Sequence, residues 1–309
     1  MSPILFLIFN RPDTTNLVFE AIRQAKPSKL YIAADGPREH VLSDIDNCSQ
    51  ARMIKSRVDW DCEVFTLFRD QNLGCRVAVS NALDWFFLHE EEGIILEDDV
   101  LPMPSFFLFC DELLQRYRHD SSVAIISGSN LIANHVSTTD SYFFSGVPLI
   151  WGWATWRRTW CQYDANIKSW PHLRSSGFFK NRFPDSYLVQ SYWRDAFDGV
   201  YKKVLNTWDY QLLLMSWISG GLTIHPKTNL TDNLGYGVGA THTSSSKPKC
   251  LLDSAPKNLD FPLRHPAVLE KLQPDIDYLI FKIVHKITWI GFVRRILRPL
   301  KRFRLSPKG

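Results

Sequence analysis

The chain has 309 residues, of which 45% are hydrophobic and 22% are charged, a composition typical of a globular protein with a well-buried core. The formal net charge is +4, but nine basic and no acidic residues lie from Tyr278 to the end, so the rest of the chain carries more acidic than basic groups. An acidic body argues against nucleic-acid binding, which needs a basic face to meet phosphates.

The cysteines and the N-terminus indicate a cytosolic protein. Six cysteines lie far apart and form no C-x-x-C pair, which argues against a zinc site and favours reduced thiols. The apolar run Ile4–Phe9 is short and leads directly into Asn10-Arg11-Pro12, so we interpret it as a buried strand and not as a signal peptide. No uncharged apolar run is long enough to predict a membrane-spanning helix.

Strand-like and helix-like patterns alternate through the first part of the chain. Strands are expected at 4–9, 30–34, 63–68, 93–96 and 123–127, and helices at 13–24, 41–57, 77–89 and 105–117. This alternation predicts an α/β fold with a mostly parallel sheet flanked by helices. Polar clusters follow three of the strands directly: Asn10-Arg11, Asp35-Gly36 and Glu97-Asp98-Asp99. Because ligands bind beyond the carboxyl ends of parallel strands, we expect these clusters to share one site.

The pattern becomes irregular after about residue 140. A tryptophan-rich stretch covers 151–156, a helix is expected over 209–219, and glycines from Gly235 on lead into a hydroxyl-rich loop that contains His242. No internal repeat is present. We predict one large domain over 1–250 and a C-terminal extension over 251–309 that carries a basic amphipathic helix.

The acidic run at 97–99 is the most informative motif. Three adjacent carboxylates after an apolar strand repel one another unless a cation or hydrogen-bond donors compensate them. A divalent ion that bridges a carboxylate and a nucleotide diphosphate would do so. In an extended strand Glu97 and Asp99 would point one way and Asp98 the other. A solvated acidic turn is the alternative, which the flanking apolar residues disfavour.

Several stretches, in the same order, resemble the Golgi-type N-acetylglucosaminyltransferase I family and related bacterial transferases. The likeness covers roughly residues 1–245 and rests on Gly93–Val100 with Pro104–Phe107, and on Asn10-Arg11-Pro12, Ala34-Asp35-Gly36, Leu149–Trp153 and Thr207-Trp208-Asp209. It implies a GT-A (Rossmann-like) fold, a nucleotide-sugar donor and a Mn²⁺ or Mg²⁺ cofactor.

The resemblance also implies roles for individual residues. Asp99 would be a metal ligand, and His242 would complete the metal site. Glu97 and Asp98 would hold ribose and sugar hydroxyls. Arg11, next to Asn10, would meet the nucleotide or its phosphate. Asp35 would contact the uracil imide. A surface arginine and an exposed loop histidine are the alternatives for Arg11 and His242.

The catalytic base is assigned to Asp209, because an inverting transferase needs a carboxylate to take the proton of the attacking hydroxyl. The family has a second Asp where this chain has Tyr210, and a helix cap is the alternative role. Asp232 is the next candidate. Trp151, Gly152 and Trp153 are assigned to an acceptor pocket, with core packing as the alternative.

Apolar residues accompany the basic ones in 278–304, a combination that suits an interfacial helix on anionic lipid. An amphipathic helix packed on the body is the alternative. The first interpretation predicts a peripheral protein on the cytoplasmic membrane face.

The sequence therefore predicts a metal-dependent glycosyltransferase in surface polysaccharide or glycoconjugate synthesis. It would move a sugar from a nucleotide-diphosphate donor, such as UDP-GlcNAc, to a glycan or lipid-linked acceptor, with inversion. One alternative is a non-catalytic carbohydrate-binding or assembly protein. The other is a sugar nucleotidyltransferase, which would need a glycine-rich basic loop after the first strand; Asn10-Arg11-Pro12 has no glycine.

Overall fold

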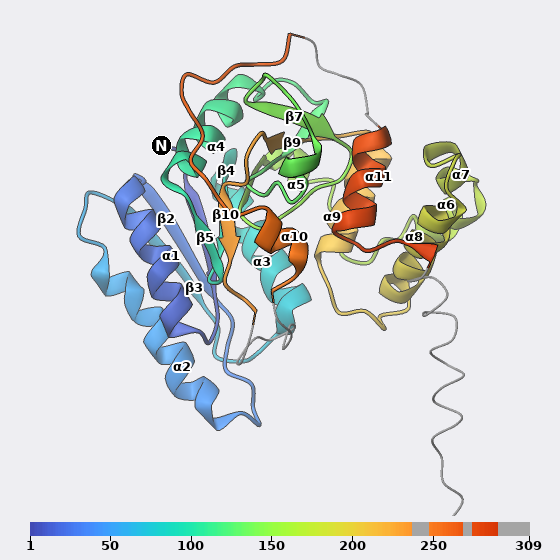
Figure 1. The fold of residues 1–309 in the computed structure, drawn as a ribbon. Coiled ribbons are helices and arrows are strands. Elements are labelled where there is room, and N and C mark those ends of the chain that lie inside the picture. The colour runs from blue at the N-terminus through green and yellow to red at the C-terminus, as the bar shows by residue number, and fades with distance from the viewer. Residues whose placement is uncertain (237–246, 268–273, 290–309) are drawn as a thin grey trace, which may run out of the picture.

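The computed structural model describes residues 1–236, 247–267 and 274–289. Its centre is an eight-stranded sheet with the strand order β3-β2-β1-β4-β8-β6-β9-β7 (Figure 1). The strands are β1 (Ile4–Ile8), β2 (Lys29–Ala34), β3 (Glu63–Phe68), β4 (Glu92–Glu97), β6 (Val123–Ser127), β7 (Tyr142–Ser145), β8 (Trp153–Trp156) and β9 (Leu222–Pro226). Strands β7 and β8 run against the other six. The mostly parallel α/β sheet flanked by helices is thus confirmed.

Helices cover both faces of this sheet. The longer ones are α1 (Pro12–Ala25), α2 (Leu42–Arg52), α3 (Gly74–His89), α4 (Pro104–Arg116), α8 (Tyr187–Tyr201), α9 (Asp209–Ser219) and α11 (Pro274–Ile283). The shorter ones are α5 (Arg157–Trp160), α6 (Trp170–Ser175), α7 (Phe178–Arg182), α10 (Lys249–Asp253) and the 3₁₀ turns η1 (Met53–Arg57) and η2 (Ala133–His135). A small ribbon of β5 (Val100–Pro102) and β10 (Thr231–Asn233) lies beside the sheet.

Alternation along β1 explains why a continuous apolar run forms a strand here. Ile4, Phe6 and Ile8 pack in the cluster that α1, α2 and α4 cover. Leu5 and Leu7 face the other way and pack with residues of α3 and α9. A central parallel strand is buried on both faces, so all of its positions are apolar.

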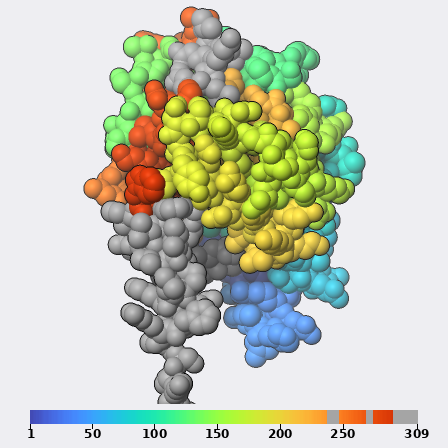
Figure 2. Space-filling model, turned by 90° about the vertical axis from the view of Figure 1, so that its right-hand side faces the viewer, coloured from blue at the N-terminus to red at the C-terminus, as the bar shows by residue number. Residues whose placement is uncertain are grey.

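An aromatic cluster outside the sheet contains three buried tryptophans of the eleven in the chain. Trp170, Trp193 and Trp217 are buried together with phenylalanines of α7, α8 and α11. Figure 2 shows the yellow segment that contains α6 to α8 beside α11, in red. These three tryptophans therefore serve core packing and are not exposed platforms for a sugar.

The start of the predicted membrane-binding helix is part of the core. Ile280 and Phe281 are 0% and 1% exposed and pack in the aromatic cluster, so the alternative of an amphipathic helix packed on the body is correct for α11. Residues 290–309 lie outside the described part of the chain. Within the described part, no helix is long and apolar enough to cross a membrane.

Candidate functional site

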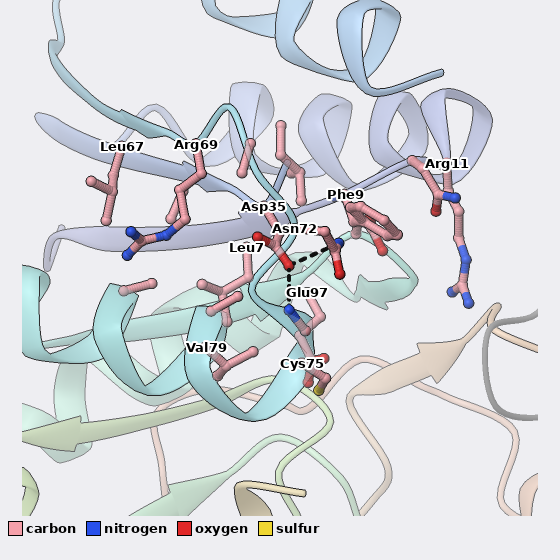
Figure 3. A pocket seen from close by; sticks show the side chains of 18 of the residues that line it. Leu7, Phe9, Arg11, Asp35, Leu67, Arg69, Asn72, Cys75, Val79 and Glu97 are labelled. Atoms are coloured by element: carbon pink, nitrogen blue, oxygen red, sulfur yellow. Dashed lines mark hydrogen bonds between the residues drawn. The ribbon is translucent and has the colours of Figure 1, made fainter. Parts of the chain in front are cut away.

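The three polar clusters meet in one pocket of about 310 Å³ at the carboxyl ends of β1, β2 and β4. Its lining includes every residue that we assigned to the nucleotide sugar and the first of the two assigned to the metal: Asn10, Arg11, Asp35, Glu97, Asp98 and Asp99. Figure 3 shows several of these side chains around the cavity. The parallel topology alone explains the convergence, because these loops leave neighbouring strands at the same edge.

An apolar slot forms the inner part of the pocket. Leu67, Ala33 and Leu7 are in register across β3, β2 and β1, and Glu97 continues the same row on β4. Residues that are paired across parallel strands share one face of the sheet. This row is the floor of the slot. The roof is the side of α3 that carries Cys75, Ala78, Val79 and Ala82. An apolar gap between a sheet and a helix that ends at a carboxylate suits a planar ring with a polar edge.

The acidic run covers the last residue of β4, Glu97, and the turn that leads to β5. Asp98 is buried, and its Oδ2 accepts a hydrogen bond from the Phe9 backbone N–H at 2.8 Å. Asp99 Oδ2 accepts from the Arg11 Nη1 at 2.5 Å. Glu97 instead ends the floor of the slot. The three carboxylates therefore meet different partners at one edge of the pocket.

Burial and mutual repulsion disfavour the charged forms of these groups. Burial raises the pKa of Asp98 to about 7, with a further contribution from the charge of Asp99. Burial also raises the pKa of Glu97 well above its usual value, and the charges of Asp99, Asp98 and Asp209 add to the effect. Such a cluster binds a cation favourably, because a positive charge relieves both penalties.

Asp35 has a role within the protein that the sequence did not predict. Its Oδ1 accepts from the backbone N–H of Gly36 and of Leu73, both at 2.9 Å. Its Oδ2 accepts from the Gly74 N–H at 3.0 Å and from the Asn72 amide at 3.1 Å. The carboxylate thus holds the turn that begins α3. Both oxygens thus have partners within the protein, and the uracil contact that the resemblance implies stays a prediction.

Asn10 points to a buried carboxylate on α2 that sequence reasoning missed. Asp44 is 1% exposed and accepts from Asn10 Nδ2 at 2.7 Å and from Arg38 Nε at 2.6 Å. The hydrogen bond from Arg38 lowers the pKa of Asp44 to about 2. Asn10 therefore ties the end of β1 to α2, and Arg38 is already paired. The sequence offers only a weak indication of this role for Asp44, because an acidic residue in the first turn of a helix is common.

Asp209 is the first residue of α9 and not its N-cap, which is Trp208. The Asp209 carboxylate accepts from the Thr207 hydroxyl and, at 3.0 Å, from the Tyr210 N–H. Its charge raises the pKa of both Glu97 and Cys75, so it lies near the acidic edge of the pocket. The neighbouring Asn206 lines the pocket directly.

Trp153 lies in the core, as the packing alternative had it. It is 0% exposed in β8, and its ring stacks on Trp208 at a centroid distance of 5.9 Å. A residue this buried offers no face to an acceptor, so Trp153 is withdrawn from the acceptor pocket. Trp151 is partly buried, and its carbonyl accepts from the Thr231 hydroxyl at 2.8 Å. Gly152 has φ 70°, which favours glycine.

Two further candidates are not among the described residues that line the pocket. Asp232 is on β10, where it forms an ion pair with Lys247. His242 falls outside the described residues, so its assignment to the metal site stays a prediction.

No protein-family model matches this chain. No curated protein sequence matches it either. Solved structures give weak likenesses. HddC from Yersinia pseudotuberculosis has a TM-score of 0.27 at 12% identity, over 41% of this chain and 57% of that one. A UDP-glucose pyrophosphorylase complexed with UDP-glucose has a TM-score of 0.28 at 13% identity, over 48% of this chain and 64% of that one.

Mouse xyloside xylosyltransferase 1 has a TM-score of 0.30 at 9% identity, over 70% of this chain and 81% of that one. The chain thus spans a little over half the length of the first of these structures and most of the length of the last. At TM-scores this low the likenesses carry no argument about activity.

Proposed function

We propose that this chain is a glycosyltransferase that uses a nucleotide-diphosphate sugar. The observation that supports it best is the continuity of the apolar slot with the acidic edge. In this proposal the slot takes a planar base, and the row that forms its floor ends at Glu97. Beyond Glu97 come Asp98, Asp99 and Arg11. Apolar, hydroxyl-binding and phosphate-binding groups thus follow one another in the order of the parts of such a donor.

Each part of the donor then has a partner in this proposal. The base lies between the floor and α3, and the ribose and sugar hydroxyls meet Glu97 and Asp98. The guanidinium of Arg11 pairs with the diphosphate, because its planar fork matches phosphate oxygens. The base would be uracil and the donor a UDP-sugar such as UDP-GlcNAc.

A Mn²⁺ or Mg²⁺ ion fits the chemistry of the acidic edge, and Asp99 is the ligand that we propose. Among the described residues no group of three or more His, Cys, Asp and Glu side chains could hold a metal by itself. The ion would therefore be shared between one or two carboxylates and substrate phosphates, a common arrangement for hard cations. Bound there, the ion would neutralise charge on the departing diphosphate.

Asp209 is the proposed general base of an inverting transfer. It lies near the acidic edge without occupying the slot, so an acceptor hydroxyl between Asp209 and the donor sugar could lose its proton to the carboxylate. The acceptor would be a glycan or lipid-linked saccharide, in surface polysaccharide or glycoconjugate synthesis. The basic residues after 289 would hold the protein peripherally on anionic lipid.

The test of this function is a thermal-shift screen of nucleotide sugars with and without Mn²⁺, since specific binding raises the melting temperature. Ala78→Phe fills the slot from the roof and should abolish the shift. Val77→Phe is the matched control, because Val77 lies on the same helix and is 36% exposed. If no nucleotide sugar raises the melting temperature, the proposal fails. If Ala78→Phe binds normally, the base is not in the slot.

The product separates the proposal from its alternatives. Release of UDP from a UDP-sugar supports a glycosyltransferase. Formation of a UDP-sugar and pyrophosphate from UTP and a sugar 1-phosphate would support the nucleotidyltransferase instead. Binding of saccharides without any turnover of either donor would support the carbohydrate-binding alternative.

A further inference from the structure

The Arg11–Asp99 contact joins two groups that the proposed function uses for different purposes. Arg11 Nη1 lies 2.5 Å from Asp99 Oδ2, and the two side chains are 18% and 21% exposed. On its other side Asp99 is in close contact with Gly235, where a β-carbon would collide with the carboxylate. The Leu234 N–H also donates to the Asp99 carbonyl at 2.7 Å. The carboxylate is therefore held in place and paired.

The other arginines that line the pocket are less well placed to bind a diphosphate at the acidic edge. Arg38 forms an ion pair with the buried Asp44. Arg69 lies with Leu67 at the far end of the slot, and Figure 3 places Arg11 on the opposite side of the labelled residues. Arg11 is thus the lining arginine next to the acidic edge.

One arginine then faces two anionic partners. While Arg11 Nη1 pairs with Asp99, the charge of the guanidinium is shared with that carboxylate and only its other N–H groups can meet a diphosphate, so the two anions compete for one cation. If it leaves, Asp99 stands unpaired beside Glu97 and Asp98, and that arrangement is costly without another cation. A second cation at Asp99 removes this competition, because it neutralises the carboxylate and leaves the whole guanidinium to the diphosphate.

We propose that Arg11 exchanges partners: it neutralises Asp99 in the empty site, and it turns to the donor diphosphate once a divalent cation pairs with Asp99. This inference rests on the proposed function. The chain's own arginine then competes with the metal in the absence of nucleotide. Metal and nucleotide should bind with positive coupling. The metal takes Asp99 away from Arg11 and so frees the guanidinium for the diphosphate, and the diphosphate takes Arg11 away from Asp99 and so frees the carboxylate for the metal.

Isothermal titration calorimetry with MnCl₂ alone tests the first half of the exchange. Arg11→Gln should bind Mn²⁺ about tenfold more tightly than wild type, because the competitor is gone. Removing any positive charge from the pocket favours a cation, so Arg69→Gln is the matched control and should change Mn²⁺ affinity by less than about twofold. Arg11→Lys retains the charge and should stay within about threefold of wild type.

Titration with UDP, and with GDP in parallel, at saturating Mn²⁺ tests the second half. Arg11→Gln should bind the nucleoside diphosphate about tenfold more weakly than wild type, the opposite direction to its effect on Mn²⁺. Mn²⁺ affinity in Arg11→Gln equal to that of wild type or of Arg69→Gln overturns the exchange. If wild type binds neither nucleotide at any Mn²⁺ concentration, the proposed function fails, and the second half of the exchange fails with it. Should the Gln variant not fold, Mn²⁺ binding by Arg11→Lys more than about tenfold tighter than wild type also overturns the exchange, because the cation is still present.

Discussion

Replacing Asp35 by alanine should destabilise the protein more than it weakens nucleotide binding. The substitution removes the acceptor of three backbone N–H groups, those of Gly36, Leu73 and Gly74, and of the Asn72 amide. Hydrogen bonds to a charged acceptor contribute about 1.5–3 kcal/mol each, and a helix cap about 0.5–2 kcal/mol. Because Asp35 is only partly buried, water can replace part of the loss. We expect the free energy of unfolding to fall by about 2–3 kcal/mol.

Urea denaturation followed by tryptophan fluorescence measures this loss. Asp35→Asn retains one oxygen and should lose about half as much. Asp70→Ala is the control, because Asp70 is an exposed acid in the loop after β3 that also contains Asn72 and Leu73, and it should leave the midpoint unchanged. Amide hydrogen exchange at Leu73 and Gly74 should accelerate in Asp35→Ala alone. If Asp35→Ala denatures at the same urea concentration as Asp70→Ala but loses nucleotide affinity, the carboxylate is a ligand contact and the reasoning is refuted.

The other predictions concern the base, the buried acid and the C-terminus. Asp209→Asn should lower turnover by ~10²–10⁴ with donor affinity unchanged; transfer within about threefold of wild type would remove Asp209 from the mechanism. Because burial raises the pKa of Asp98 to about 7, the folded metal-free protein holds a proton that the unfolded chain releases near pH 4. The free energy of unfolding should therefore fall as the pH rises from about 4 to about 7. In urea denaturation at several pH values, the free energy of unfolding of Asp98→Asn should fall less with rising pH than that of wild type. The same pH dependence in both proteins would contradict this. Deleting 290–309 should release the protein from anionic liposomes without lowering the melting temperature, whereas deleting 278–309 also removes the buried Ile280 and Phe281 and should destabilise it by several kcal/mol. A protein cut after 289 that still pellets with the liposomes would exclude the tail as the anchor.

Hydrophobic pattern alone was sufficient for most of the first 127 residues. Strands β3 and β6 begin and end where the sequence predicts, and so, later in the chain, does α9. Parallel strands covered on both faces are short apolar runs between turn residues, which makes them easy to recognise. The same pattern also predicts that the polar clusters at their ends meet, because strand direction fixes which loops share an edge.

The later elements could be recognised only in part. Helix α8 was missed although Val189, Trp193, Phe197 and Val200 repeat at helical spacing and Ser186 caps it. Strand β8 has four residues and lies between β4 and β6, a pairing with partners distant in sequence that no local pattern encodes. Trp153 shows a further limit, because aromatic residues serve cores and sugar sites alike.

The roles of single carboxylates were the hardest to predict. Asp35 follows a strand at the expected edge, but apart from the adjacent Gly36 N–H its donors come from the 72–74 turn, far along the chain. A sequence shows that a carboxylate is present, whereas only the fold shows whether the protein has already used its oxygens.

The pocket draws almost all of its described lining from one end of the chain. With the exception of Asn206, these residues belong to the first 99, which form the four consecutive parallel strands β3-β2-β1-β4. If the proposed function is correct, most substitutions after residue 100, away from Asn206 and the Leu234–Gly235 contact with Asp99, should change the acceptor more than the recognition of the nucleotide. Chimeras joined within β5 would exploit this separation, combining one donor half with different second halves.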